Sequence, residues 1–401
     1  MGKNLVVILS FFVFLESIFF GLAVKYFKIN KFLLLVLAVF SLSSYLFFSY
    51  EILNFDRSVG VKHTFYWAIG ILVLHFVPKL ISILFWFISI LLVLIPSNII
   101  KSNNINSRKD FIGKLGLVIA SIPFSAIIYG IWKGKYNFKV INQQIEFADL
   151  PVEFDGFKIL QISDLHSGSF DDSKKIEYAV DLINQQDFDL CLFTGDIVNA
   201  KATEFIPWIN TFKAIKTPVY GKYSVLGNHD YGEYINWPSE AEKKSNFNAI
   251  KNLHDQIDFT LLNNQNVILK KGNSKIAIVG VENWGKKFKK VGDLNAASKG
   301  LLSEDFKILM SHDPSHWEYE VKNHPSNFQL TLSGHTHGLQ FGIEIPGFIK
   351  WSPIQYVYKQ WAGLYKHLNR YVYVNRGFGF HAFPGRVGIW PEISVLEIKK
   401  S

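Results

Sequence analysis

Long apolar runs fill the first third of the chain, and only short ones follow after about residue 133. Four of the long runs approach the ~20 apolar residues that a helix needs to cross a bilayer; they are Leu5–Val24, Phe32–Tyr50, Tyr66–Ile95 and Leu115–Trp132. The third is too long for one straight span and predicts either one tilted, kinked helix or a re-entrant pair. We therefore expect a multi-pass integral membrane protein whose residues 1–135 form a bundle of about four transmembrane helices.

One acidic residue, Glu16, lies inside the first apolar run. Carboxylates within a membrane are costly and are functional candidates by default. The alternative is a hydrogen bond that ties this helix to a neighbouring one. The sequence leaves both interpretations open.

From residue 136 to the C-terminus, short apolar strands alternate with polar stretches of helical character. The pattern predicts strands at 157–163, 189–194, 219–227, 306–311 and 328–333, and helices at 173–186, 204–215 and 246–254. Strands separated by helices are typical of an α/β domain whose functional edge lies at the carboxyl ends of the strands. Residues 136–401 are therefore expected to form one α/β domain.

Each of these five strands ends in residue types that bind metals, namely SDLH, TGD, GNHD, SHDP and SGHTHG. One such ending is common in any sheet, but five are hard to explain as solvated loop tips. Carboxylate, imidazole and amide groups without a thiolate suit divalent Mn, Fe, Zn, Co or Mg. His335 and His337 are two residues apart, so in a strand both rings would point to the same face.

The ordered run D-x-H, GD, GNH-D, H and GH-x-H resembles the calcineurin-like metallophosphoesterase superfamily over about residues 155–398. The resemblance implies a β-sandwich flanked by helices, with two divalent metal ions and a bridging hydroxide that attacks a phosphoester or pyrophosphate. By position it assigns Asp164, His166 and His337 to one ion, Asn228, His312 and His335 to the other, and Asp196 to a bridge between them. It also makes His229 the catalytic residue, which stabilises the transition state or protonates the leaving oxygen.

The C-terminal stretch 375–398 resembles a membrane-anchored subgroup of that superfamily. This chain departs from the subgroup at Leu339, where a second glycine is frequent. Some relatives of the subgroup resemble enzymes that cleave UDP-2,3-diacylglucosamine in lipid A biosynthesis. This implies a lipid-linked substrate and favours the cytosolic side for the domain, whereas the lysines and arginines beside the apolar runs are nearly balanced. Arg376 and Arg386 are candidate phosphate-binding residues through their planar guanidinium groups, with a salt bridge near the last strand as the alternative.

The net charge of +9 fits a partner that is either nucleic acid or anionic lipid. Beside transmembrane runs the membrane is favoured, and the run Lys286–Lys290 with Phe288 is only a faint hint of nucleic acid. A nuclease or nucleotide phosphodiesterase would keep the same metal site and remains an alternative. A non-catalytic metal-binding sensor or scaffold is the other, disfavoured because no catalytic position is missing. His254 and His316 lie outside the motifs and are expected to be surface histidines.

Overall fold

The structure is a computed structural model that describes residues 2–93, 105–345 and 347–401. The chain forms two compact units. The N-terminal unit contains Met1–Asp56, Val61–Trp132 and Ala382–Pro384, and the C-terminal unit contains Arg57–Gly60, Lys133–His381 and Gly385–Ser401. Each unit has its own architecture and is described separately.

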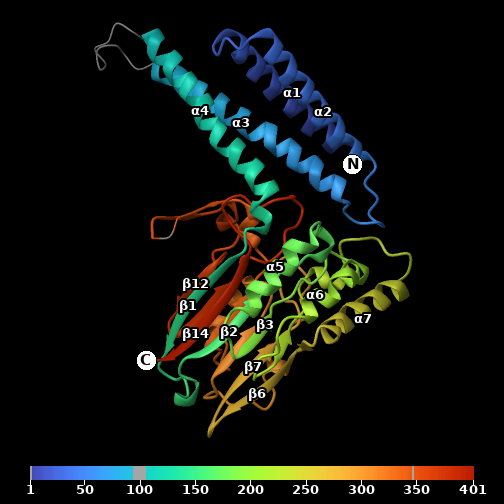
Figure 1. The fold of residues 1–401 in the computed structure, drawn as a ribbon, viewed down its shortest axis with the longest axis vertical. Helices are drawn as coiled ribbons and strands as arrows, with labels where there is room; N and C mark the ends of the chain where they lie inside the picture. Colours follow the sequence, from blue (N-terminus) through green and yellow to red (C-terminus); the bar gives the residue numbers. More distant parts are fainter. Residues whose placement is uncertain (1, 94–104, 346) are drawn as a thin grey trace. The chain divides into compact units, whose positions relative to one another are not determined.

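The N-terminal unit consists of long helices (Figure 1), which are α1 (Gly2–Lys25), α2 (Lys31–Leu53), α3 (His63–Val93) and α4 (Ile105–Trp132). Within the described residues, three stretches are long and apolar enough to span a membrane: Lys31–Leu53, His63–Leu91 and Phe111–Trp132. The third apolar run is one helix with Pro78 inside it rather than a re-entrant pair. Its expected end at Ile95 lies outside the described residues.

A polar network joins three helices of this unit around Glu16. The Glu16 carboxylate accepts hydrogen bonds from Lys79 Nζ at 2.8 and 2.9 Å and from the Tyr45 hydroxyl at 2.8 Å. Ser41 donates to the same carboxylate at 3.3 Å. These partners come from α2 and α3, so the carboxylate ties both helices to α1. Of the two interpretations of Glu16, the structure provides the hydrogen-bonded one.

Replacing Glu16 by leucine is expected to destabilise the helical unit, because Lys79 would keep its charge without a carboxylate and with only the Ser41 hydroxyl left from this network. Breaking a buried ion pair on one side costs roughly 3–5 kcal/mol, whereas replacing both partners by apolar residues is often neutral. Glu16→Leu should therefore lower the thermal unfolding temperature in detergent, and Glu16→Leu/Lys79→Met should restore it. A double variant no more stable than the single one would contradict this account.

The C-terminal unit is a sandwich of two six-stranded sheets. The first sheet contains, in spatial order, β1 (Lys139–Phe147), β14 (Glu392–Lys400), β2 (Phe157–Ile162), β3 (Leu190–Phe193), β4 (Lys222–Ser224) and β5 (Thr260–Leu261). The second contains β12 (Gly363–His367), β13 (Arg370–Val374), β9 (Leu330–Ser333), β8 (Lys307–Met310), β7 (Ser274–Gly280) and β6 (Gln265–Lys271). A separate hairpin pairs β10 (Ile343–Ile345) with β11 (Ile349–Trp351). The expected α/β sandwich is confirmed.

Helices cover the outer faces of the two sheets. The first is covered by α5 (Ser173–Asn184), α6 (Ile209–Lys213) and α7 (Glu240–Gln256), as Figure 1 shows, and the second by α8 (Leu294–Ala297) and α9 (Ser315–Tyr319). β2 is buried on both faces, because Leu160 and Ile162 pack under the helices while Phe157 and Ile159 pack between the sheets. Strands buried on both faces read as continuous apolar runs, which is how the sequence shows them.

Two of the expected helices differ from those in the structure. The stretch expected at 204–215 is broken into 3-10 turns at Ala202–Glu204 and Ile206–Trp208, the second containing Pro207, before α6 begins. A proline early in a helix is tolerated, but it cannot donate the backbone hydrogen bond of a helix interior. The helix expected at 246–254 lies inside the longer α7, which begins after Ser239 because that side chain caps the Glu242 amide.

His254 and His316 are not surface residues, since both are completely buried. Burial lowers the pKa of His254 to about 3 and that of His316 to about 3. Between that value and the ordinary pKa near 6.5, an unfolded chain binds a proton that the folded chain does not. Both residues therefore contribute a loss of stability as the pH falls below about 6.5.

The His254→Leu variant should be less sensitive to acid than the wild type. Over about 1.5 pH units below 6.5, one such histidine costs roughly 2 kcal/mol, or a shift of roughly 5 °C in Tm for a domain of this size. Thermal unfolding of the full-length protein at pH 7.5 and pH 5.0 measures the shift. Equal shifts in wild type and variant would show that His254 is not the group responsible.

Candidate metal centre

The predicted metal ligands gather at one edge of the sandwich, just beyond the ends of five strands. Asp164 and His166 follow β2, Asp196 follows β3, Asn228 and His229 follow β4, His312 follows β8, and His335 and His337 follow β9. β2, β3 and β4 run parallel in one sheet, and β8 and β9 run parallel in the other. Because parallel strands end at the same edge, both sheets deliver their ligands to one place.

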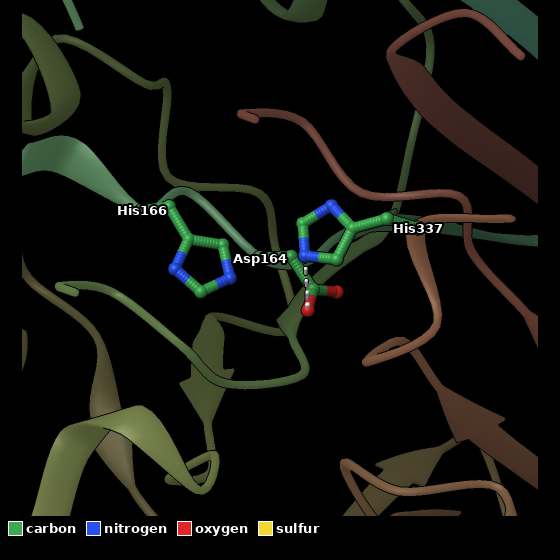
Figure 2. Close-up of side chains that lie close together, drawn as sticks. All are labelled: Asp164, His166 and His337. Atoms are coloured by element: carbon green, nitrogen blue, oxygen red, sulfur yellow. Dashed lines mark ion pairs between the residues drawn. The ribbon is translucent and has the colours of Figure 1, made fainter. Parts of the chain in front are cut away.

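Three groups of side chains place their ligand atoms within 4.8 Å of one another: Asp164, His166 and His337; His166, Asp196 and His229; and Asp196, His312 and His335. Figure 2 shows the first group, in which Nε2 of His337 lies 3.3 Å from Oδ1 of Asp164. Asp196 belongs to two groups and lies 3.6 Å from His166 and 3.1 Å from His312. Six of the seven predicted ligand residues, all but Asn228, therefore occur in these groups, and Asp196 belongs to a group with His166 and to a group with His312 and His335.

The backbone is left-handed at five of these residues. Asp164, His166, Asp196, His335 and His337 have φ between 48° and 69°. Such values are uncommon outside glycine, and they concentrate at functional sites where the surrounding fold holds them in place. Their spacing suggested that His335 and His337 would point to one face of a strand. They lie instead in the turn after β9.

The hydrogen bonds of each ring determine which nitrogen faces the centre. Nδ1 of His312 donates to the Thr194 carbonyl at 2.7 Å, and Nδ1 of His166 contacts the Asn199 side-chain oxygen at 3.1 Å. Both rings therefore present Nε2 as the ligand atom, and their Nδ1 partners fix the ring orientation as in known metal sites. His335 is reversed, because its Nε2 contacts the Tyr358 hydroxyl at 2.9 Å and leaves Nδ1 as the ligand atom.

Asn228 supplies a test of whether these residues fit a metal. Its side-chain nitrogen donates to the Tyr234 hydroxyl at 2.6 Å, while its side-chain oxygen is buried and accepts no hydrogen bond from the described residues. A buried polar atom without a partner is costly. A divalent cation would satisfy this oxygen, and oxygen and imidazole ligands together suit such ions.

The electrostatics of the centre also favour a cation. Burial raises the pKa of Asp196, but His312 and His229 outweigh it and hold that pKa below its ordinary value. Burial lowers the pKa of His312, yet the adjacent Asp196 carboxylate raises it to about 10. The buried carboxylates thus attract positive charge, and a divalent cation supplies more of it than a proton on His312 does.

Several neighbours of the centre were not predicted. Asn199 contacts His166 through its side chain and accepts from His229 Nδ1 through its carbonyl at 2.7 Å. The ring of Tyr234 stacks on His229 at 4.2 Å, and that of His381 stacks on His166 at 4.8 Å. A backbone carbonyl leaves no trace in a sequence, whereas His381 stood in the GFGFHAFPGR stretch and had a signal of the right residue type.

Asp230 holds two loops of the centre together. Its carboxylate accepts from the backbone amides of Gly227 at 2.8 Å, Asp196 at 2.9 Å and Ile197 at 2.9 Å. Those amides belong to the loops after β3 and β4. Burial, followed by the charge of Asp196, raises the pKa of Asp230 to about 7.

The two candidate phosphate-binding arginines are both engaged within the fold. Arg376 forms ion pairs with Glu344 and Glu392, which is the alternative that the sequence left open. Arg386 is fully buried and donates to the carbonyls of Gly377 and Gly379, while its Nη2 lies 3.1 Å from His337 Nδ1. Binding a phosphate through Arg376 would require breaking these ion pairs.

Comparison with known proteins identifies the relatives of this chain. Residues 157–339 match the family described as "Calcineurin-like phosphoesterase". The chain is 30% identical to the "Uncharacterized metallophosphoesterase YkuE" of Bacillus subtilis over 74% of its own length and 98% of that protein. The chain belongs to the calcineurin-like metallophosphoesterases. Membership of this family supports a phosphoester hydrolase.

The N-terminal unit has relatives of its own. Residues 3–135 of the metallophosphoesterase match the family described as "Probable Calcineurin-like phosphoesterase, transmembrane domain". The chain is also 24% identical to the "Transmembrane protein with metallophosphoesterase domain" of Danio rerio, over 72% of this chain and 62% of that protein. Together with the three apolar helices, these matches make the metallophosphoesterase a membrane protein.

Proposed function

We propose that this protein hydrolyses phosphoester bonds at a pair of divalent ions on the metal-centre edge of its sandwich. Asp164, His166 and His337 would hold one ion, Asn228, His312 and His335 the other, and Asp196 would contact both. The observation that carries the proposal is the convergence of these side chains from two sheets, with ligand atoms within 4.8 Å of one another in each group. The N-terminal unit, with a boundary near residue 135, would anchor the domain in the membrane.

Bound ions of this kind lower the pKa of a water molecule and offset the charge of phosphate oxygens. The chain itself orients His229 and supplies the proton that this residue carries. The Asn199 carbonyl accepts a hydrogen bond from His229 Nδ1, and the Tyr234 ring stacks on the imidazole. Nε2 is therefore the nitrogen presented to substrate. His229 then donates a proton to the leaving oxygen or stabilises the charge that develops on the phosphate.

We propose that the substrate is a phosphorylated small molecule carried by a lipid, such as UDP-2,3-diacylglucosamine, met on the cytosolic side of the membrane. Two features support a lipid-borne substrate: the membrane anchor and the net charge of +9, which favours anionic head groups. The lysine run offers little support for a nucleic-acid substrate. Lys289 is paired with Glu233, Lys286 contacts Tyr319, and Phe288 packs edge-on against His335 at 4.8 Å.

Full-length protein in detergent with Mn²⁺ should be compared on bis-p-nitrophenyl phosphate, p-nitrophenyl phosphate and UDP-2,3-diacylglucosamine, with Asp196→Asn as the control. Turnover of the lipid nucleotide well above both generic esters would support the full proposal. Turnover of the generic esters alone would support the chemistry and remove the named substrate. No turnover of any of the three would favour a sensor or scaffold.

A further inference from the structure

The surface beside the metal centre carries an unusual concentration of apolar side chains. Among described residues after Lys133, eight of the sixteen exposed large apolar side chains fall between positions 339 and 357: Leu339, Ile343, Ile345, Phe348, Ile349, Trp351, Tyr356 and Val357. Phe348 is 86% exposed and Tyr356 is 78% exposed. Single exposed apolar residues are ordinary, but a contiguous set of them marks a surface that meets another apolar phase. We call residues 339–345 and 347–357 the apolar hairpin region.

The β10–β11 hairpin in this region has its faces reversed relative to an ordinary soluble sheet. Ile343 pairs with Trp351 and Ile345 with Ile349, so these four share one face, and all four are exposed. Glu344 pairs with Lys350 on the other face, where Glu344 is half-buried and Lys350 is exposed but contacts the body of the domain. Antiparallel sheets in water place apolar side chains inward and polar ones outward.

Contacts of Glu344 and Lys350 with the body of the domain hold the hairpin in this orientation. Glu344 binds the guanidinium of Arg376 at 2.5 and 2.9 Å, and Arg376 is itself tied to Glu392 on β14. Lys350 donates to the Ala362 carbonyl and lies over the rings of Trp361 and Tyr365 at 5.2 and 5.1 Å. Flipping the hairpin would break all of these contacts, because side chains alternate with period two. The fold therefore fixes the outward direction of the apolar face.

The same region is attached directly to the metal centre. The hairpin begins six residues after the ligand His337, and the Ser352 hydroxyl donates to the Gly338 carbonyl at 2.7 Å. Ser352 is fully buried. The apolar face is thus a rigid extension of the turn that carries His335 and His337.

A bilayer is the apolar phase within reach of this domain. Six residues, 133–138, separate the end of α4 from the start of β1. Such a segment spans at most ~20 Å, so a short linker tethers the first strand of the sandwich to the last candidate membrane helix. Tryptophan and tyrosine beside isoleucine and phenylalanine form the composition of membrane–water interfaces, where amphipathic rings lie at head-group level.

We propose that the apolar hairpin region inserts into the interface of the bilayer that holds the helices, and so keeps the metal centre at the lipid surface. The docking itself does not depend on the enzymatic activity. A further consequence, that the domain prefers esters presented in a bilayer over the same esters in solution, rests on the proposed function.

Insertion is tested with full-length protein in phosphatidylcholine–phosphatidylglycerol vesicles. A Phe348→Cys variant, with Cys191→Ala to remove the natural thiol, carries an environment-sensitive fluorophore. The matched control is Val219→Cys, which is 88% exposed and lies before β4, at the sheet edge opposite the metal centre. Nitroxide on the acyl chains should quench the label at 348 and leave the label at 219 unchanged. Equal quenching at both positions overturns the proposal. So does the absence of quenching at 348, which is also the result expected if a second copy of the chain covers the hairpin.

The catalytic consequence needs its own readout. Phe348→Glu should lower hydrolysis of a vesicle-borne p-nitrophenyl phosphodiester of diacylglycerol at least about tenfold, since burying one phenylalanine is worth that much or more. Hydrolysis of soluble bis-p-nitrophenyl phosphate should not change, and Val219→Glu should affect neither substrate. If both substrates are lost, the variant has harmed the fold and the quenching result alone decides. Selective quenching without any hydrolysis would leave the docking in place and remove the proposed function.

Discussion

Asp196→Asn is expected to abolish hydrolysis of bis-p-nitrophenyl phosphate by the full-length protein. Asp196 belongs to two of the three ligand groups, one with His166 and one with His312 and His335, so its replacement weakens both predicted ion sites together. It is also buried and accepts from the His229 amide at 2.8 Å through Oδ1. An asparagine keeps an oxygen for that bond but removes the negative charge. We expect a loss of roughly 10³-fold or more, because transition-state charge stabilisation and the reacting water both depend on the ions.

Metal content distinguishes this result from misfolding. The Asp196→Asn variant should bind less than the wild-type amount of Mn²⁺, measured by elemental analysis after gel filtration, while its unfolding temperature without metal stays close to that of the wild type. The Asp187→Asn variant is a suitable control, since the Asp187 side chain is 87% exposed and forms an ion pair with Lys158. Full turnover in Asp196→Asn would refute the proposed site.

His229→Ala should lose activity while keeping its metal. The ring of His229 approaches the centre but is held by Asn199 and Tyr234, which suits a group that acts on substrate more than one that serves as a ligand. General acid–base groups typically contribute 10²–10⁴-fold, so we expect a loss in kcat within that range. A leaving group of low pKa, such as p-nitrophenolate, needs less protonation than an alkoxide. The loss should therefore be larger for an alkyl phosphodiester than for the p-nitrophenyl ester.

Elemental analysis tests the assignment of His229 directly. Wild-type metal content in His229→Ala, together with the predicted dependence on leaving group, would establish its catalytic role. Loss of one equivalent of metal would instead make His229 a ligand, as its presence in the group with His166 and Asp196 allows. His381→Ala is a useful comparison, because its ring contacts both His166 and His229 without belonging to any ligand group among the described residues.

The sequence was most informative where apolar runs ended in ligand-type residues. Strands β2, β3, β8 and β9 are mostly apolar because both faces of each sheet are covered, and their last residues lead directly into the motifs. β4 was expected over nine residues and has three, Lys222–Ser224. Gly221, with φ of 84°, interrupts the extended backbone just before the strand begins. The motif positions were unaffected, since parallel strands share one functional edge whatever their length.

The sequence was least informative where long-range contacts override a local pattern. The alternation in IEI and IKW predicts a strand with its apolar face turned inward. Glu344 reverses this by binding Arg376, which lies 32 residues further along the chain. The buried positions of His254 and His316 were likewise invisible, because histidine is found both inside and on the surface. Such features depend on partners that are brought together only by the completed fold.

The left-handed turns at Asp164, His166, Asp196, His335 and His337 limit which mutations can survive at the centre. Side chains branched at Cβ are outliers in that conformation, while asparagine, aspartate, histidine and glycine tolerate it. A library that randomised these positions would lose the valine, isoleucine and threonine variants because they fail to fold, before any assay of catalysis. The small alphabet that remains consists largely of metal ligands. Neutral drift at these positions is therefore confined to residues that can still coordinate a cation, which makes loss of the centre by gradual substitution slow.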